Sequence, residues 1–331
     1  MQVVCNVAST ADIGSARRQA VAVATESAFD ETACGRVAII VTELATNLVS
    51  HGGGGRLLVQ FLSSAGSNAV EVLSIDSGPG MVDPERCLRD GFSNGSTPGN
   101  GLGAVKRLSD EFDLFSQQGK GTVVLSRVYG RAPASKATWR WGVISTAAPY
   151  ESVIGDSWRL AATSDGVRVL VADGVGHGPL ASEAAEGMAA IFDAAPTAAL
   201  KSLIERGHSV LRSTRGAAVA VASYSLATDK LVYAGVGNIS GTLLAGGGTT
   251  RGLMSHNGTV GAEMRSVQEL PYEWASGDRL VMHSDGINTR WQLGSYTGLG
   301  LLHPALTAAI LFRDFLRGKD DATVVVIERA R

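Results

Sequence analysis

Short glycine clusters beside acidic or amide residues, at the ends of apolar runs, are the feature that most restricts how this chain can fold. Glycine supplies 41 of the 331 residues, yet the glycines follow no fixed period, and hydrophobic residues make up 45% of the chain. This combination excludes a collagen and a disordered linker. We therefore expect a globular protein whose glycines serve local needs, such as tight turns and close approach of the backbone to a ligand.

The overall charge and the cysteines favour no particular partner. Lys and Arg number 29 against 31 Asp and Glu, so no basic field would attract nucleic acid or an anionic membrane. The three cysteines, Cys5, Cys34 and Cys87, lack the spacing of a zinc site or a disulfide framework. The start of the chain has no leader pattern, and no stretch of about 18 uncharged apolar residues occurs. We expect a soluble cytoplasmic protein that binds neither nucleic acid nor membrane.

Hydrophobic periodicity predicts two α/β (α+β) domains, one over residues 1–130 and one over 139–331, separated by a linker at 131–138 that lacks periodicity. In the first domain the order of elements suggests helices layered on one sheet, whereas the second is rich in strands and suggests two packed sheets with helices outside. The predicted strands are 3–7, 56–63, 69–76, 112–116, 122–129, 139–145, 157–163, 167–172, 217–225, 231–234, 242–245, 279–283 and 323–328, and the predicted helices are 10–27, 31–51, 102–111, 180–193, 197–212 and 305–316.

Glu43 and Asn47 lie four residues apart on the second helix and therefore share one of its faces. The Asn47 side chain can present a carbonyl oxygen to a hard cation such as Mg²⁺, and Glu43 can accept a proton or hold a water. The alternative for this pair alone is an ordinary polar helix surface.

Two glycine motifs follow in the first domain. Asp76-Ser-Gly78-Pro-Gly80 ends an apolar strand, where a carboxylate can accept a hydrogen bond from an exocyclic amine while the glycines let backbone approach a flat base. Taken alone, this motif can equally be a tight turn. Gly99-Asn-Gly101-Leu102-Gly103 opens the next helix, and free backbone N–H groups at a helix start can bind phosphates.

The order of these motifs, with Gly119-Lys-Gly121-Thr122 after them, resembles the ATP-binding domain shared by gyrase-type ATPases, histidine kinases and the serine/threonine kinases of bacterial sigma-factor control. Together with 90–93, the run 101–112 is most similar to the switch kinase of the stressosome pathway. The resemblance implies a GHKL-type sandwich with helices on one mixed sheet. It also implies that ATP binds here, with Mg²⁺ on Asn47 and with Glu43 as the catalytic base. Adenine would bind Asp76 near Thr122, with Gly78 and Gly80 also at the nucleotide site, and the phosphates would bind Gly99, Gly101, Leu102 and Gly103.

Acidic residues also mark strand ends in the second domain. Asp156, Asp173, Asp285 and Asp320 each border an apolar run. Carboxylates gathered at strand ends, with a glycine exposing a backbone carbonyl, suit Mg²⁺ or Mn²⁺. Two such ions can bind a phosphate ester and activate a water for attack on phosphorus. The alternative for any single Asp-Gly pair is a hairpin turn.

As an ordered set, these motifs resemble the SpoIIE-type branch of the metal-dependent type 2C protein phosphatases, with Gly237-Asn238 at the family's glycine-asparagine element. The resemblance implies a type 2C phosphatase-like α-β-β-α sandwich. It implies as metal ligands Asp156, Asp173, Asp285 and Asp320, with the carbonyl of Gly174 and with Asp321 as an alternative. Ile154 stands where the family often has glycine. His177 is either a general acid or a hydrogen-bonded structural group.

A phosphate-donor site and a phosphate-hydrolysing site on one chain suggest a bifunctional switch that phosphorylates and dephosphorylates one partner. By resemblance, this partner is a small STAS-type antagonist or scaffold protein of a bacterial sigma-factor or stress-response system. Two alternatives remain open. In one, only the phosphatase is active and the nucleotide-binding domain regulates it. In the other, the first domain sequesters a sigma factor or an activator under the control of ATP.

Overall fold

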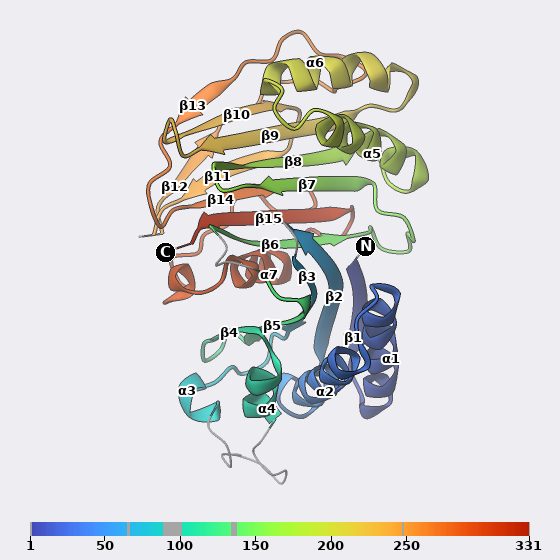
Figure 1. Cartoon of the computed structure of the whole chain (residues 1–331), viewed down its shortest axis with the longest axis vertical. Helices are drawn as coiled ribbons and strands as arrows, with labels where there is room; N and C mark the ends of the chain where they lie inside the picture. Colours follow the sequence, from blue (N-terminus) through green and yellow to red (C-terminus); the bar gives the residue numbers. More distant parts are fainter. Residues whose placement is uncertain (1, 65–66, 89–100, 134–137, 247, 331) are drawn as a thin grey trace. The chain divides into compact units, whose positions relative to one another are not determined.

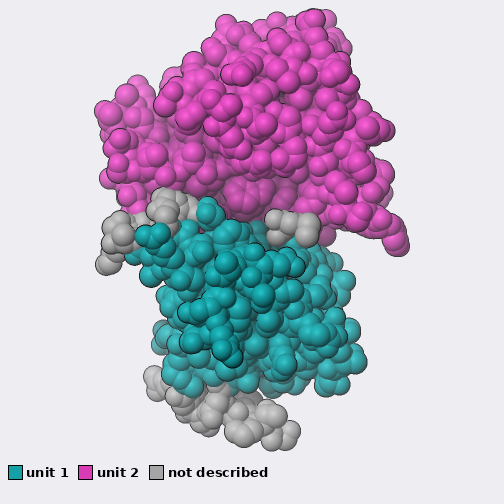
Figure 2. Space-filling view, turned by 45° about the vertical axis from the view of Figure 1, so that its right-hand side comes forward, with its two compact units in different colours: residues 1–136, 296–313 teal, residues 137–295, 314–331 magenta. Residues whose placement is uncertain are grey.

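The computed structural model describes residues 2–64, 67–88, 101–133, 138–246 and 248–330. The chain divides into two compact units (Figure 2). Unit 1 comprises residues 1–136 and 296–313, and unit 2 comprises 137–295 and 314–331. The main division lies within the expected linker, but 296–313 groups with the first unit. The functional domains at 1–130 and 139–331 stay a prediction.

One five-stranded sheet forms the centre of unit 1, and its strands lie in the order β1-β2-β3-β5-β4. All four pairings are antiparallel, so this sheet, expected to be mixed, has no parallel pair among its described strands. Short connections join β2 to β3 and β4 to β5, as suits antiparallel neighbours. The strands are β1 (Gln2–Val7), β2 (Gly55–Ser64), β3 (Ser67–Ile75), β4 (Glu111–Ser116) and β5 (Thr122–Arg131).

Helices α1 (Thr10–Glu26) and α2 (Glu31–Asn47) lie side by side on one face of this sheet (Figure 1). Asp30 begins α2 by accepting a hydrogen bond from the Ala33 amide at 2.7 Å, as an N-cap does. By length and composition, Glu31–Gly52, with mean hydropathy 1.3, could cross a membrane. Ile40 and Leu44 on this segment are fully buried in the core of unit 1, whereas Ile39 is 48% exposed.

Helix α2 continues into a single π-helical turn (Leu48–Gly52), and two shorter helices, α3 (Pro84–Cys87) and α4 (Gly101–Leu108), complete this part of unit 1. Gly53 ends the π-helical turn with φ +70°, a conformation that glycine adopts without strain. The sequence predicted one helix through residue 51, and the structure divides that stretch between two helical forms.

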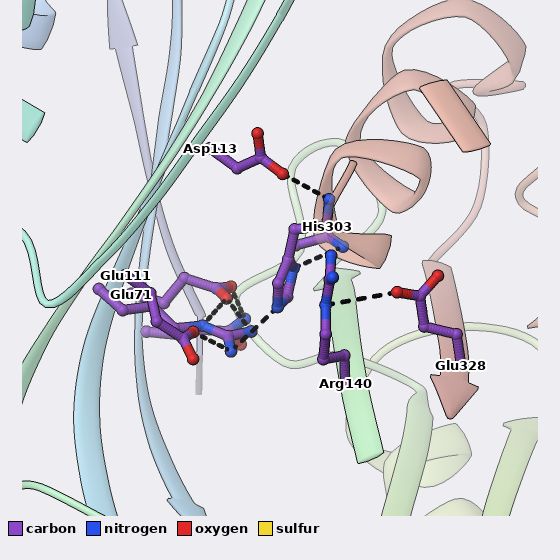
Figure 3. A network of polar contacts seen from close by, with 9 residues as sticks. Glu71, Glu111, Asp113, Arg140, His303 and Glu328 are labelled. Carbon is purple, nitrogen blue, oxygen red and sulfur yellow. Dashed lines mark hydrogen bonds and ion pairs between the residues drawn. The ribbon is translucent and has the colours of Figure 1, made fainter. Parts of the chain in front are cut away.

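The segment 296–313, distant in sequence, packs within unit 1 and carries most of helix α7 (Pro304–Phe315). The His303 backbone N–H donates to Asp113 Oδ2 at 2.6 Å (Figure 3). The guanidinium of Arg56 lies 5.5 Å from the centre of the Phe312 ring, and Tyr296 packs on Phe115 with ring centres 6.0 Å apart. A helix that the sequence assigns to the second domain thus forms part of the first unit's fold.

A buried ion pair joins strands β3 and β5. The Arg127 guanidinium lies 2.7 Å from Glu71 and 2.9 Å from Glu111. Gln60 donates to the other Glu71 oxygen at 2.7 Å, and His303 Nε2 lies 3.4 Å from Arg127 (Figure 3). Because several partners satisfy the buried charges, this network links four strands, β2, β3, β4 and β5, to the segment at His303.

Unit 2 contains two five-stranded antiparallel sheets, ordered β13-β10-β9-β8-β7 and β12-β11-β14-β15-β6. Aromatic residues join them: Trp141 packs on Trp158 with ring centres 6.0 Å apart, and Trp139 on Tyr224 at 5.5 Å. The strands are β6 (Trp139–Thr146), β7 (Asp156–Ala162), β8 (Gly166–Gly174), β9 (Ala217–Ser225), β10 (Lys230–Val236), β11 (Ser240–Leu244), β12 (Thr250–Leu253), β13 (Leu270–Tyr272), β14 (Arg279–His283) and β15 (Ala322–Arg329).

Two helices, α5 (Pro179–Ala194) and α6 (Leu200–Val210), cover the first of these sheets (Figure 1). Their buried side chains, including Met188 and Ile204, form one core with Leu170 and Val221 of the sheet. Single 3-10 turns lie at Leu211–Ser213 and Leu299–Leu301. The predicted architecture, helices on one sheet followed by a sandwich of two sheets, is confirmed.

Candidate functional site

A cavity of about 870 Å³ opens in unit 1 between α2, the end of β3 and the start of α4. The sequence motifs of this half converge on it. Its lining includes the predicted nucleotide-site residues Glu43, Asn47, Asp76, Gly80, Gly101, Leu102 and Thr122.

Asp76 is held rigidly at the end of β3. One carboxylate oxygen, Oδ1, accepts hydrogen bonds from the backbone amides of Gly78 at 2.9 Å and Thr122 at 3.0 Å. Burial nevertheless raises the Asp76 pKa above its ordinary value. Thr122 Oγ1 is engaged with Ser116 at 2.9 Å. These bonds leave Asp76 Oδ2 as the acceptor that can receive an exocyclic amine from a base in the cavity.

Glycine is required around Asp76 for steric reasons. Gly80 has φ +69°, and a Cβ there would stand 2.2 Å from the Gln117 carbonyl oxygen. A Cβ on Gly78 would stand 2.8 Å from the Gly52 carbonyl oxygen, and one on Gly121 would stand 2.2 Å from that of Asp76. Backbone segments therefore approach one another so closely here that only glycine fits.

Glu43, Asn47 and the start of α4 face one another. A Cβ on Gly101 would stand 2.9 Å from Glu43 Oε2 and 3.7 Å from Asn47 Oδ1. The Asn47 side-chain amide nitrogen is buried and has no hydrogen-bond partner among the described residues. An oxygen-rich corner with an unsatisfied amide fits a Mg²⁺–phosphate group. Gly103 is buried within α4, and Gly99 and the run at 90–93 lie outside the described residues.

Arg313 contacts Asp76, and the sequence did not predict this contact. From α7, its Nη1 donates to the Asp76 carbonyl oxygen at 2.9 Å, within unit 1. The two residues are separated by 237 positions. The only available signal was a basic residue near the end of a predicted helix, which does not identify a partner.

Strand pairing gathers the acidic residues of unit 2 at one end of the sandwich. Asp156, the first residue of β7, lies opposite Asp173 near the end of β8. Asp285 follows β14 and Asp320 precedes β15, and these two strands are also paired. Four residues far apart in sequence thus meet at corresponding strand ends, as the motif order predicted.

Burial and mutual repulsion raise the pKa values of these carboxyl groups. For Asp173, burial is the largest cause, followed by the charges of Asp156, Asp285 and Asp320, and its pKa rises to about 9. Burial raises the pKa of Asp156 to about 7. The pKa of Asp285 is also raised, by burial and then by Asp320. A cation bound among these groups would offset their repulsion and favour the ionised carboxylates.

Hydrogen bonds orient the individual carboxylates. Ser284 donates to Asp156 Oδ2 at 2.6 Å, whereas Asp156 Oδ1 is buried and has no partner among the described residues. The Asn238 amide donates to Asp285 Oδ2 at 2.8 Å. Neither contact can be predicted from the sequence, because Ser284 and Asn238 lie far along the chain from Asp156 and Asp285, respectively.

Asp321 differs from Asp320 in its contacts. The Asp321 carboxylate accepts from the Ala148 backbone amide at 2.8 Å, and only 3% of the residue is exposed. This side chain therefore ties the start of β15 to the segment after β6. Within the described ranges of the chain, the Asp320 carboxylate accepts a hydrogen bond from the adjacent Asp321 amide, at 2.9 Å.

The carboxylates at this end of unit 2 are chemically suited to bind a divalent cation, but their side chains do not converge on one point. No three His, Cys, Asp or Glu side chains in the described part of the chain are grouped tightly enough to hold a metal ion as they lie. The all-oxygen donors and the unsatisfied Asp156 Oδ1 nevertheless suit Mg²⁺ or Mn²⁺.

The glycines of this site are sterically required. A Cβ on Gly174 would stand 2.0 Å from the Ala181 carbonyl oxygen, and a Cβ on Gly286 would stand 2.0 Å from that of Asp321. His177 Nδ1 lies 2.6 Å from Glu151 Oε1, and its side chain is more than half exposed. The histidine is therefore a paired group on the loop beside Asp173.

Together, the fold and these sites define a kinase-like ATPase unit combined with a type 2C serine/threonine phosphatase unit. Residues 7–127 match the model of the histidine kinase-like ATPase domain, and residues 163–330 match that of stage II sporulation protein E (SpoIIE). The chain belongs, through its first part, to the family of the kinase RsbT and, through its second part, to the SpoIIE family.

Two proteins of Bacillus subtilis (strain 168) illustrate these relationships. The serine/threonine-protein kinase RsbT is 35% identical over 113 residues, which cover 34% of this chain and 85% of RsbT. The phosphoserine phosphatase RsbX is 24% identical over 138 residues, which cover 42% of this chain and 69% of RsbX.

Solved structures agree in fold. A crystal structure of RsbX in complex with magnesium is 20% identical, with a TM-score of 0.53, and the match covers 60% of this chain and 99% of that one. A chain from a study of the bacterial stressosome is 25% identical, also with a TM-score of 0.53, and the match covers 57% of this chain and 99% of that one.

Proposed function

We propose that this chain is a bifunctional switch protein that phosphorylates serine or threonine on a small partner and hydrolyses the same phosphate ester. The observation that supports this proposal is that one chain brings together both predicted sets of site residues. Glu43 and Asn47 face the start of α4 in unit 1, and Asp156 and Asp173 are paired in unit 2. The relatives of the two parts, named as a serine/threonine-protein kinase and a phosphoserine phosphatase, support this combination.

In the kinase reaction, we assign adenine to Asp76 and its neighbours Gly78, Gly80 and Thr122. The phosphates lie on the N–H groups that open α4, at Gly101, Leu102 and Gly103, with Gly99 before them. Asn47 would hold Mg²⁺, which neutralises phosphate charge when bound. The hydroxyl oxygen of the partner's serine or threonine bonds to the γ-phosphorus, and ADP leaves. Glu43 accepts the proton of that hydroxyl.

In the phosphatase reaction, Asp156, Asp173, Asp285, Asp320 and the Gly174 carbonyl would hold Mg²⁺ or Mn²⁺. Such ions, when bound, supply a water of lowered pKa. We choose Asp320 over Asp321 because the Asp321 carboxylate already accepts from the Ala148 amide. Ser284 orients Asp156, and we give His177 a structural role because Glu151 holds its ring.

The partner we propose is a small STAS-type antagonist or scaffold protein in the bacterial cytoplasm. A sigma factor or an activator is the alternative partner, bound rather than modified. This assignment follows the resemblance to partner-switching kinases and phosphatases, and the similarity to a chain from the stressosome supports it.

The test uses the full chain, a STAS-type partner and labelled ATP. With Mg²⁺ and ATP the wild-type chain should label the partner, and with Mn²⁺ it should release the label as phosphate. Glu43→Gln should lose labelling and keep release, whereas Asp173→Asn should do the reverse.

Other outcomes separate the alternatives. Release that persists while the wild type shows no labelling would favour a phosphatase with a regulatory nucleotide domain. ATP-dependent binding of a partner without transfer would favour sequestration. If the wild-type chain shows neither labelling nor release, the bifunctional proposal is rejected.

A further inference from the structure

Arg215 lies at the same end of unit 2 as the acidic residues, although it belongs to no motif. It precedes β9, whose first residue, Ala217, lies opposite Gly174 at the end of β8. The Val175 amide donates to the Gly216 carbonyl oxygen at 3.0 Å, so the approach to β9 is fixed to the loop after Asp173.

The Arg215 side chain lies across this loop. Its Nη1 is 3.0 Å from the point where a Cβ on Gly176 would stand, and Gly176 has φ +90°. The missing side chain at Gly176 therefore leaves the space that the guanidinium occupies.

Arg215 is exposed and makes no hydrogen bond or ion pair within the described ranges of the chain. The acidic side chain that reaches the same loop, Glu151, is already paired with His177 at 2.6 Å. A guanidinium with five unused donors at the edge of an acidic site is suited to receive an anion.

The charge of the site explains why such a cation is useful. Asp156, Asp173, Asp285 and Asp320 gather negative charge in one place, and even with bound cations a phosphate ester approaches carboxylates that repel it. Arginine matches a phosphate in geometry, because two parallel N–H groups can bond two of its oxygens.

We propose that Arg215 binds the phosphoryl oxygens of the phosphoserine or phosphothreonine substrate at the phosphatase site. This inference rests on the proposed phosphatase function and adds a substrate-binding residue to it. Arg215 would hold the substrate without ligating the metal ions, so its loss should weaken phosphate binding more than metal binding.

The experiment compares Arg215→Ala and Arg215→Lys with Arg212→Ala in the Mn²⁺-loaded full chain. Arg212 is a matched control because it is an exposed arginine three residues earlier, in the 3-10 turn Leu211–Ser213. The measurements are kcat and KM for a phosphoserine peptide, and calorimetric binding of inorganic phosphate and of Mn²⁺.

Arg215→Ala should raise KM and the phosphate dissociation constant about 10-fold. It should leave the Mn²⁺ dissociation constant within about two-fold of the wild type. The KM and the phosphate dissociation constant of Arg215→Lys should lie between those of the wild type and of Arg215→Ala, because lysine keeps the charge but not the paired donors. Arg212→Ala should match the wild type in every measurement.

Unchanged phosphate binding in Arg215→Ala would overturn the inference, as would an equal loss in Arg212→Ala. Failure of the proposed function is distinguishable, since it would appear as absence of peptide hydrolysis by the wild type. Phosphate calorimetry decides the role of Arg215 even then. Equal melting temperatures of the variants establish that they are folded.

Discussion

The hydroxyl of Ser284 donates a hydrogen bond of 2.6 Å to Oδ2 of Asp156, a residue 128 positions earlier in the chain. The same hydroxyl oxygen accepts a hydrogen bond from the Thr323 amide at 3.0 Å. Ser284 therefore joins the start of β7 to the start of β15 and leaves only Oδ1 of Asp156 free to face a cation. A carboxylate fixed in this way is a better ligand than one that rotates.

Replacing Ser284 with alanine should weaken Mn²⁺ binding about 10- to 100-fold, because outer partners of metal ligands have effects of this size. Calorimetric titration of the metal-free full chain measures the change. Ser157→Ala is the control: Ser157 is a buried serine next to Asp156, but it bonds Glu186 at 2.7 Å. Equal losses in the two variants would show that Ser284 has no special role.

The metal-free protein should lose stability as the pH rises. Burial, followed by repulsion among the carboxyl groups, raises the pKa of Asp156 to about 7 and that of Asp173 to about 9. Since both groups ionise near pH 4 in an unfolded chain, the native state holds the extra protons between these limits. Their contribution is complete below about pH 4 and is lost as the pH passes 7 and then 9.

Melting temperatures in a chelator at pH 5.5 and pH 8.5 test this effect. We expect the lower melting temperature at pH 8.5, and Mn²⁺ should reduce the difference because it binds the ionised carboxylates. Asp173→Asn should also reduce the difference in the chelator. A metal-free protein that melts higher at pH 8.5, by a margin that Asp173→Asn leaves unchanged, contradicts the prediction.

Asp76→Asn should weaken ATP binding about 10- to 100-fold. The change removes a charged acceptor, and it leaves an amide nitrogen facing the hydrogen-bond donors of the base. Either effect alone is expected to weaken binding by about this factor. Fluorescence titration with an ATP analogue measures it. Asp83→Asn is the control, because Asp83 lines the same cavity but caps α3 through Arg86, a task that asparagine performs equally well. A similar affinity in both variants would exclude Asp76 as the adenine acceptor.

Arg127→Met should destabilise unit 1 by about 3–5 kcal/mol, since it leaves the buried Glu71 without its counter-charge. Urea unfolding followed by a probe in unit 1 measures the loss. Arg159→Met should have an effect below about 1 kcal/mol, although Arg159 also contacts two carboxylates, because Glu186 and Asp193 are about half exposed. Comparable losses in the two variants would mean that burial of the pair does not matter.

Local patterns in the sequence were enough for most of the fold. The apolar, β-branched residues of β3 and the helical spacing of Val37, Ile40 and Leu44 in α2 predicted elements that the structure contains. Strand-end aspartates predicted the acidic cluster, because strand ends that pair must bring Asp156 and Asp173 together. The strands β12 and β13 were missed, since four and three residues are too short to show a period.

The partners of the site residues could not be predicted in the same way. Ser284 and Asp156, or Arg313 and Asp76, meet only because separate elements pack in three dimensions. Nothing in the spacing of two residues 128 or 237 positions apart identifies such a contact. The same applies to Arg215, whose position follows from the register of β8 and β9 rather than from its own neighbours in sequence.

The grouping of residues 296–313 with unit 1 limits how the gene could be divided into two. A gene divided within the linker would encode a first product without Tyr296, His303 and Arg313, and a second product that carries them away from Phe115, Asp113 and Asp76. No single cut between the two parts frees both intact. Arg313 can therefore support Asp76 only when both parts are made as one chain.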